Sequence, residues 1–209
     1  MRREAHKVAR RKATRQGLPP VLIVCEGSET EPNYIEGLCA HLGVNMAAVR
    51  VIRGDNHSSP ADLVRKAQRI FTEDGGFDFV YVICDGDAGG LAEAGGLAQK
   101  RIRNAAKQVT NVQLVANHPC IEFWLLLHFE YSSAPFSAAE ALTRLRHHLP
   151  DYQKSEPKIF EMVAAGLDTA CNNAAQLKAE HAASGALTPN TDMGSLIDRL
   201  RDMKKLAEA

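Results

Sequence analysis

Residues 21–32 read VLIVCEGSETEP, and this stretch decides the fold. Its first five residues are wholly apolar, which predicts a short strand buried on both faces. Thr30 then opens a predicted helix that ends near Gly43. Between this strand and this helix, Glu26 follows the last strand residue. Gly27 then allows a tight turn that leaves room beside the Glu26 carboxylate. The pattern therefore predicts a buried strand that presents an acid at its carboxyl end.

The same rhythm of strand and helix continues along the chain. Further strands are predicted at residues 48–52, 77–84 and 112–117, and further helices begin near Pro60, residue 97 and Pro119. Four strands that alternate with helices predict an α/β fold, a doubly wound parallel sheet flanked by helices. Right-handed crossovers favour the strand order 2-1-3-4, which places the first and third strands side by side.

Three segments are expected along the chain. A basic arm covers residues 1–17, the α/β domain covers residues 18–135, and a helical C-terminal extension at residues 136–209 packs on that domain. The arm carries seven Lys or Arg against Glu4 alone, so the rest of the chain is net acidic although the total charge is zero. Such an arm is either a solvated tail or a segment that binds nucleic-acid backbone without sequence preference.

The composition argues against several classes of protein. With 45% apolar and 24% charged residues the chain has the balance of a globular domain, and no apolar run is long enough to span a bilayer. No secretory leader is recognisable, because the basic arm leads into a short strand rather than a longer apolar segment. The five cysteines form no CxxC pair, which is typical of buried thiols in a reducing compartment. We therefore expect a cytoplasmic protein that does not bind membranes.

A second acidic cluster follows the third predicted strand, where residues 79–87 read FVYVICDGD. Because the carboxyl ends of parallel strands share one edge, Glu26, Asp85 and Asp87 are expected to converge in the crevice there. Three crowded carboxylates require a divalent cation or a shared proton, and ligation by oxygen alone favours Mg²⁺ or Mn²⁺ over Zn²⁺. Either acidic cluster alone is also explained by a solvated acidic turn. An acid after the first strand together with an Asp-x-Asp after the third is a far more specific sign of a metal site.

Three further polar residues are candidates for the same crevice. Glu31 lies in the first turn of a predicted helix, where the helix dipole favours an acid, so it is either structural or a metal ligand. Asn117 and Glu122 follow the fourth strand, where they either orient water and phosphate or merely begin the next helix. We prefer the capping role for Asn117 and the functional role for Glu122.

Other residues near the crevice cannot be ranked from the sequence. His57, His118 and His128 come from three elements that approach it, but a single histidine is more often a surface or core residue than a catalytic one. Candidates for stabilising phosphate charge are Arg53, Asp55, Asn56, Lys66 and Lys158.

Three blocks of the sequence resemble the signature blocks of the RloB-like family, a branch of the Toprim proteins. They are VLIVCEGSETEPNYIEGL at residues 21–38, VYVICDGDAGG at residues 80–90 and ANHPCIEFWLLLHFE at residues 116–130. The similarity covers most of the chain from about residue 20 and includes PNTDMGSLIDRL at residues 189–200.

The resemblance implies a Toprim-like fold, with a glutamate after the first strand and an Asp-x-Asp after the third that bind Mg²⁺. Glu26, Asp85 and Asp87 match those positions. The family is encoded in bacterial and archaeal defence or restriction loci, often near an ATPase, so an effector of immunity against phage is implied. The chain itself contains no phosphate-binding loop of the GxxxxGK[ST] type, so any ATP-driven step requires a partner.

Two functions are therefore expected from the sequence. The first is a metal-dependent nuclease in which Glu26, Asp85 and Asp87 hold Mg²⁺ or Mn²⁺, while Glu31 or Glu122 completes a second metal site or positions water. Its substrate would be DNA or RNA, tRNA included. The alternative is a non-catalytic metal-binding or regulatory partner of a defence ATPase. A phosphatase of the haloacid dehalogenase type is disfavoured, because there the Asp-x-Asp follows the first strand.

Overall fold

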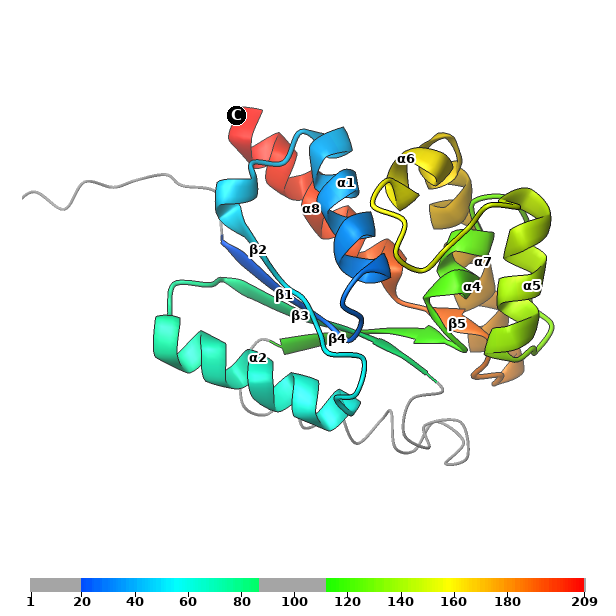
Figure 1. Ribbon diagram of the computed structural model, residues 1–209, viewed down its shortest axis with the longest axis horizontal. Coiled ribbons are helices and arrows are strands. Elements are labelled where there is room, and N and C mark those ends of the chain that lie inside the picture. The colour runs from blue at the N-terminus through cyan, green and yellow to red at the C-terminus, as the bar shows by residue number, and fades with distance from the viewer. Residues whose placement is uncertain (1–19, 87–111, 209) are drawn as a thin grey trace, which may run out of the picture.

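The computed structural model describes residues 20–86 and 112–208, which form a sheet covered by helices (Figure 1). The strands are β1 (Val21–Cys25), β2 (Val49–Ile52), β3 (Phe79–Asp85), β4 (Val112–His118) and β5 (Asn190–Thr191). Their order is β2-β1-β3-β4-β5, in which the first four are parallel and β5 runs antiparallel to β4. The predicted α/β class and the order of the parallel strands are confirmed. The sheet has five strands, however, and not the predicted four.

Seven helices and two 3₁₀ turns complete the described residues. They are α1 (Thr30–Leu42), η1 (Met46–Ala48), α2 (Pro60–Asp74), α4 (Ile121–Leu126), α5 (Ala138–His148), α6 (Ile159–Val163), η3 (Ala164–Gly166), α7 (Leu167–Ser184) and α8 (Met193–Glu208). The predicted end of the first helix is confirmed, since Gly43 adopts the left-handed conformation that terminates α1. Ser59 and Asp62 form a capping box at the start of α2, where each side chain accepts a hydrogen bond from the other's backbone N–H.

The sheet separates two apolar layers. Figure 1 shows α2 on one face of the sheet and α1 with α8 on the other. The layer under α2 is small and contains Leu63, Val64 and Ala67 of that helix against alternate strand residues. The layer on the opposite face is larger, because α1 and α4 to α8 all contribute to it. Helices α4 to α7 are grouped near the carboxyl ends of the strands (Figure 1), so the C-terminal part of the chain lies beside the predicted crevice.

Strand β5 was missed by the sequence analysis because it is only two residues long. It pairs Thr191 with Asn117 and Asn190 with His118. Two polar residues give no alternating pattern to recognise. The pairing is stabilised by side chains, since the Thr191 hydroxyl donates to Asn117 Oδ1 at 2.7 Å. This short strand fixes the start of α8 beside the end of β4.

Several predictions lie outside the described residues. These are the basic arm at residues 1–17, the helix near residues 97–107, and Asp87. The boundary between an α/β domain and a C-terminal extension also stays a prediction. Among the helices of the described residues, none is both long enough and apolar enough to cross a membrane.

A buried histidine lies at the centre of the larger apolar layer. His128 Nδ1 lies 3.1 Å from the Trp124 carbonyl oxygen, so this nitrogen carries the proton, and Nε2 then accepts from the Tyr34 hydroxyl at 3.1 Å. The rings of Tyr34 and Trp124 pack edge-on against the imidazole. Burial lowers the pKa of His128 to about 4, and the hydrogen bond to Trp124 offsets this only in part. His128 is therefore a neutral core residue at neutral pH.

This burial predicts a loss of stability in mild acid. The unfolded chain binds a proton at His128 below a pKa of about 6.5, whereas the folded chain binds one only near 4. Between these values the unfolded state holds more protons, so the free energy of unfolding should fall by about 1.4 kcal/mol per pH unit as pH decreases, about 3 kcal/mol in all. Urea unfolding of the wild type and His128→Gln from pH 7.5 to pH 4.5 measures this, and the variant should lack this component. A matched control is His147→Gln at an exposed position, which should keep the wild-type pH dependence.

Candidate functional site

Glu26 and Asp85 meet at the carboxyl ends of the two central strands. β1 and β3 are neighbours in register, with Cys25 opposite Ile83, and the Glu26 N–H extends this pairing by donating to the Ile83 carbonyl at 3.0 Å. The Glu26 side chain then turns toward β3, where Oε2 accepts the Asp85 backbone N–H at 3.0 Å. The structure thus brings these two acids together, although 58 residues separate them in the chain.

Asp85 also organises the next element of the chain. Its Oδ1 accepts the Ile121 N–H at 2.9 Å, and Ile121 is the first residue of α4. The N-cap residue Cys120 makes no side-chain capping bond, so the carboxylate from β3 takes that role. The interpretation of Asn117 as the cap of this helix is therefore wrong. Asn117 is fully buried and pairs with Thr191 instead.

Glu31 is a buried acid in the first turn of α1. Only 5% of its surface is exposed, and its Oε1 accepts the Gly27 N–H at 3.1 Å. A Cβ atom on Gly27 would lie 2.1 Å from Glu31 Oε2, which explains why glycine follows Glu26. Burial raises the pKa of Glu31, and the charge of Glu122 raises it further, while the hydrogen bond from Gly27 lowers it in part. The carboxyl group thus holds a proton more readily than an exposed glutamate.

Glu122 lies deeper than the other acids. It is 1% exposed and belongs to the first turn of α4, as expected for this position. Its Oε1 accepts the Tyr152 hydroxyl at 3.1 Å and lies 3.5 Å from Lys154 Nζ. Burial alone would lower the pKa of Lys154, but the carboxylates of Glu122 and Asp85 outweigh it and hold that pKa above its usual value. Lys154 is therefore a stable cation next to both acids.

A cavity of about 610 Å³ opens at these side chains. Its acidic lining residues are Glu26, Glu29, Glu31 and Asp85. The C-terminal part of the chain contributes Arg146, Gln153, Lys154 and Ser155 to the lining. Its volume is in the range of sites that enclose small ligands. Glu122 is not part of its lining and reaches it only through Lys154.

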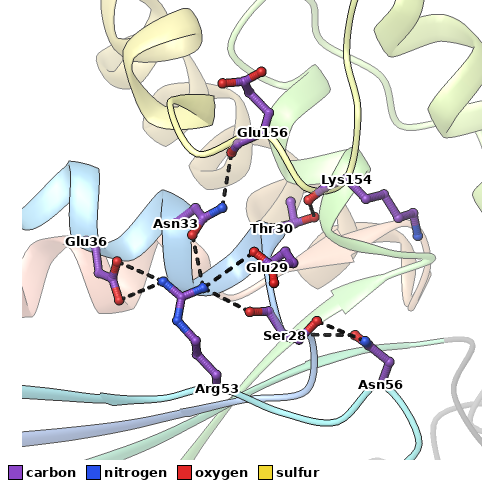
Figure 2. Close-up of polar contacts among 9 residues, drawn as sticks. All are labelled: Ser28, Glu29, Thr30, Asn33, Glu36, Arg53, Asn56, Lys154 and Glu156. Carbon is purple, nitrogen blue, oxygen red and sulfur yellow. Dashed lines mark hydrogen bonds and ion pairs between the residues drawn. The ribbon is translucent and has the colours of Figure 1, made fainter.

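The turn that carries Glu26 is braced by Arg53 from the end of β2 (Figure 2). The guanidinium donates to the Ser28 carbonyl at 2.9 Å and to Asn33 Oδ1 at 3.1 Å. Its other nitrogen forms a bidentate pair with Glu36 on α1 at 3.0 and 3.1 Å. Arg53, which the sequence made a candidate for phosphate binding, is thus hydrogen-bonded to Ser28, Asn33 and Glu36. Its contacts connect the turn after β1 to α1.

The loop after β2 supplies a second brace that the sequence analysis did not find. The Gly54 N–H donates to the Gly27 carbonyl at 3.0 Å, and the Asn56 N–H donates to the Glu26 carbonyl at 3.2 Å. Asn56 also exchanges hydrogen bonds with Ser28, whose N–H and hydroxyl both lie 3.0 Å from its amide. A Cβ atom on Gly54 would lie only 1.7 Å from the Glu26 carbonyl oxygen. An isolated glycine between charged residues was the only signal in the sequence.

The remaining candidates have local structural roles. Asp55 closes a turn by accepting the N–H groups of His57 and Ser58. Lys66 donates to the Arg53 carbonyl at 3.4 Å. His118 packs against Gly86, where a Cβ atom would lie 2.3 Å from the imidazole Nδ1.

The donor set fits Mg²⁺ or Mn²⁺ in kind, because Glu26, Asp85 and Glu31 offer only carboxylate oxygens to the cavity. The backbone N–H groups that donate to Glu26 and Asp85 fix the orientation of both carboxylates. Within residues 20–86 and 112–208, no group of three or more His, Cys, Asp or Glu is arranged to hold a metal ion. The third acid of the expected set, Asp87, lies outside these ranges.

Comparison with known proteins gives one further finding. The model of a family described as RloB-like protein matches residues 21–200, which confirms the resemblance drawn from the sequence blocks. No curated protein and no solved structure matches the chain.

The brace after β2 predicts that Gly54→Ala destabilises the protein. The added methyl group overlaps the Glu26 carbonyl, so the turn or the loop must shift, and we expect the free energy of unfolding to fall by about 1–3 kcal/mol. Urea unfolding measures this. Gly194→Ala is the matched control, because a Cβ atom there meets nothing within 4 Å and should stabilise the protein by up to about 1 kcal/mol. Equal stability of the two variants would contradict the role of Gly54.

Proposed function

The chain belongs to the RloB-like protein family, and we propose that it is a Mg²⁺- or Mn²⁺-dependent nuclease that hydrolyses phosphodiesters of DNA or RNA, tRNA included. One observation carries the proposal. Glu26 Oε2 lies 3.0 Å from the Asp85 backbone nitrogen, and both carboxylates line a cavity with Glu31. Glu26 directly after β1 and Asp85 at the end of β3 support a Toprim-like assignment of the sheet.

Glu26, Asp85 and Asp87 would hold the ion, with Asp87 included because it completes the Asp-x-Asp of the resemblance. A bound divalent ion lowers the pKa of a coordinated water and neutralises charge on the scissile phosphate. The chain contributes orientation: Glu26 is fixed by the Asp85 N–H, and Asp85 is fixed by the Ile121 N–H. Carboxylates held in this way need little rearrangement when they bind, which is what an efficient site requires.

Two acids remain for the second ion or for the attacking water. Glu31 lines the cavity and is the better placed for contact with water. Its pKa is raised by burial, so the group takes up a proton more readily than an exposed glutamate. Glu122 lies behind the lining, so it acts through Lys154 and Tyr152, which it holds at 3.5 and 3.1 Å. We therefore assign Glu31 to water and Glu122 to the support of Lys154.

The biological role proposed is that of an effector in defence against phage or foreign DNA. It rests on the resemblance to a family encoded in such loci. A separately encoded ATPase is the expected partner, and the basic arm would add affinity for nucleic-acid backbone that does not depend on sequence.

Asp85→Asn tests the proposal with little damage to the fold. The amide Oδ1 can still accept the Ile121 N–H, so the free energy of unfolding should change by less than about 1 kcal/mol. The negative charge is lost, so cleavage of plasmid, single-stranded DNA or total tRNA in Mg²⁺ or Mn²⁺ should fall by about 100-fold or more. The matched control is Asp198→Asn on the exposed side of α8, which should cleave like the wild type.

Two results would argue against the nuclease. Wild-type cleavage by Asp85→Asn would mean that this carboxylate takes no part in the reaction. A wild-type protein that binds Mn²⁺ but cuts none of these substrates, alone or with the ATPase, would instead favour the regulatory alternative.

A further inference from the structure

The C-terminal part of the chain contributes four residues to the cavity lining, Arg146, Gln153, Lys154 and Ser155, which form a basic wall. Arg146 belongs to the last turn of α5, and Gln153, Lys154 and Ser155 lie in the loop between α5 and α6. Sequence analysis did not select any of these residues. They lie more than 100 residues beyond Glu26, in a region read only as a helical extension.

This wall is held at a fixed distance from the acidic turn. The Thr30 hydroxyl donates to the Lys154 carbonyl at 2.6 Å, and the Asn33 amide donates to the Glu156 carbonyl at 3.2 Å (Figure 2). Thr30 and Asn33 belong to the first turn of α1, which directly follows the turn of Glu26. The loop from Lys154 to Glu156 is therefore attached through its backbone to the same helix that positions Glu31. The side chains of Lys154 and Ser155 line the cavity, whereas Glu156 does not.

The two cations of the wall are available to a ligand. Arg146 forms no hydrogen bond or ion pair with any residue in the described part of the chain, although it lines the cavity. Lys154 has a side chain that is 68% exposed, and its contact with Glu122 is long at 3.5 Å. An exposed cation without a short ion pair adds little to the stability of a fold. The presence of both cations in one cavity with Glu26 and Asp85 instead suits an anionic ligand that also binds a divalent cation.

We propose that Arg146 and Lys154 bind the phosphodiester backbone of a nucleic-acid strand in this cavity and hold the strand against the acidic side. The inference deepens the proposed nuclease function and rests on it for the identity of the ligand. A phosphate group satisfies both requirements, because its oxygens accept hydrogen bonds from guanidinium and ammonium groups and also ligate divalent ions. Arg146 presents a planar fork suited to two phosphate oxygens, whereas Lys154 acts as a compact charge.

Lys154 has a second consequence for the site. Its ion pair with Glu122 compensates that buried carboxylate and keeps the ammonium group near the cavity. The ammonium group therefore contacts phosphate while it stays close to Glu122, whereas Arg146, which has no ion pair within the described residues, adapts to the strand. We expect the two residues to contribute separately to affinity.

Binding without cleavage tests this. Fluorescence anisotropy of a fluorescein-labelled 12-nucleotide oligo(dT) is measured in EDTA between 50 and 300 mM KCl, with the full chain as wild type, Lys154→Gln, Arg146→Gln and Lys154→Arg. We expect Lys154→Gln and Arg146→Gln each to weaken binding by about tenfold, and each to reduce the slope of log Kd against log salt by about 0.7, the value for one lost phosphate contact on a single strand. Lys154→Arg should keep the wild-type slope.

Lys158→Gln is the matched control, because Lys158 is exposed at the start of α6 and does not line the cavity. It should bind within about twofold of the wild type, with its salt slope reduced by much less than 0.7. Circular dichroism of each variant at the assay temperature checks that the protein is folded.

The inference is overturned if Lys154→Gln and Arg146→Gln, both folded, bind the oligonucleotide with the wild-type Kd and salt slope, or if the wild type does not bind it. A structural role for Lys154 alone would lower stability in Lys154→Gln and leave the salt slope unchanged. Failure of the nuclease proposal looks different, because Asp85→Asn is read by cleavage in Mg²⁺ or Mn²⁺, while the strand-binding wall is read in EDTA.

Discussion

The hydrogen bond from the Asp85 backbone N–H to Glu26 Oε2 is the interaction on which the site depends. It exists only because β1 and β3 are adjacent and parallel, so that their carboxyl ends reach the same edge. It turns the Glu26 carboxylate toward the neighbouring strand instead of into solvent. Asp85 in turn caps α4 through Ile121, so one chain of bonds joins two strands and a helix. A carboxylate at the end of a buried strand is costly unless it is paired in this way.

Near this hydrogen bond lies a cavity that is lined by both acidic and basic residues. The acidic side is held by short contacts between neighbouring segments, including the brace of Arg53 and the close approach of Gly54 to Glu26. The basic side is held by backbone contacts between α1 and the loop that carries Lys154. The proposed phosphodiester hydrolysis would use such a pairing, with oxygens for a divalent ion and cations for the phosphate. The C-terminal part of the chain thus contributes to the cavity lining in addition to covering the sheet.

Much of the fold could be predicted from local patterns. The wholly apolar run before Glu26 specified a buried strand, Ser59 with Asp62 specified a capping box, and Gly43 specified a helix end. Each of these depends on a few adjacent residues. Strand β5 could not be predicted, because its two residues become a strand only by pairing with Asn117 and His118. The role of Asn117 was misread for the same reason, since its partner Thr191 is 74 residues away.

The sequence by itself determined the strand order, because alternation of strands with helices and the handedness of crossovers leave few other arrangements. It also determined the family, through the resemblance of three sequence blocks, and the two acids that end neighbouring strands. Only the tertiary structure decided which polar residues serve the protein and which face the cavity. The sequence does not distinguish Arg53 from Arg146. In the structure Arg53 donates hydrogen bonds to Glu36 and Ser28, whereas Arg146 lines the cavity. The two arginines differ in which distant segments of the chain lie beside them, and the local sequence carries no information about that.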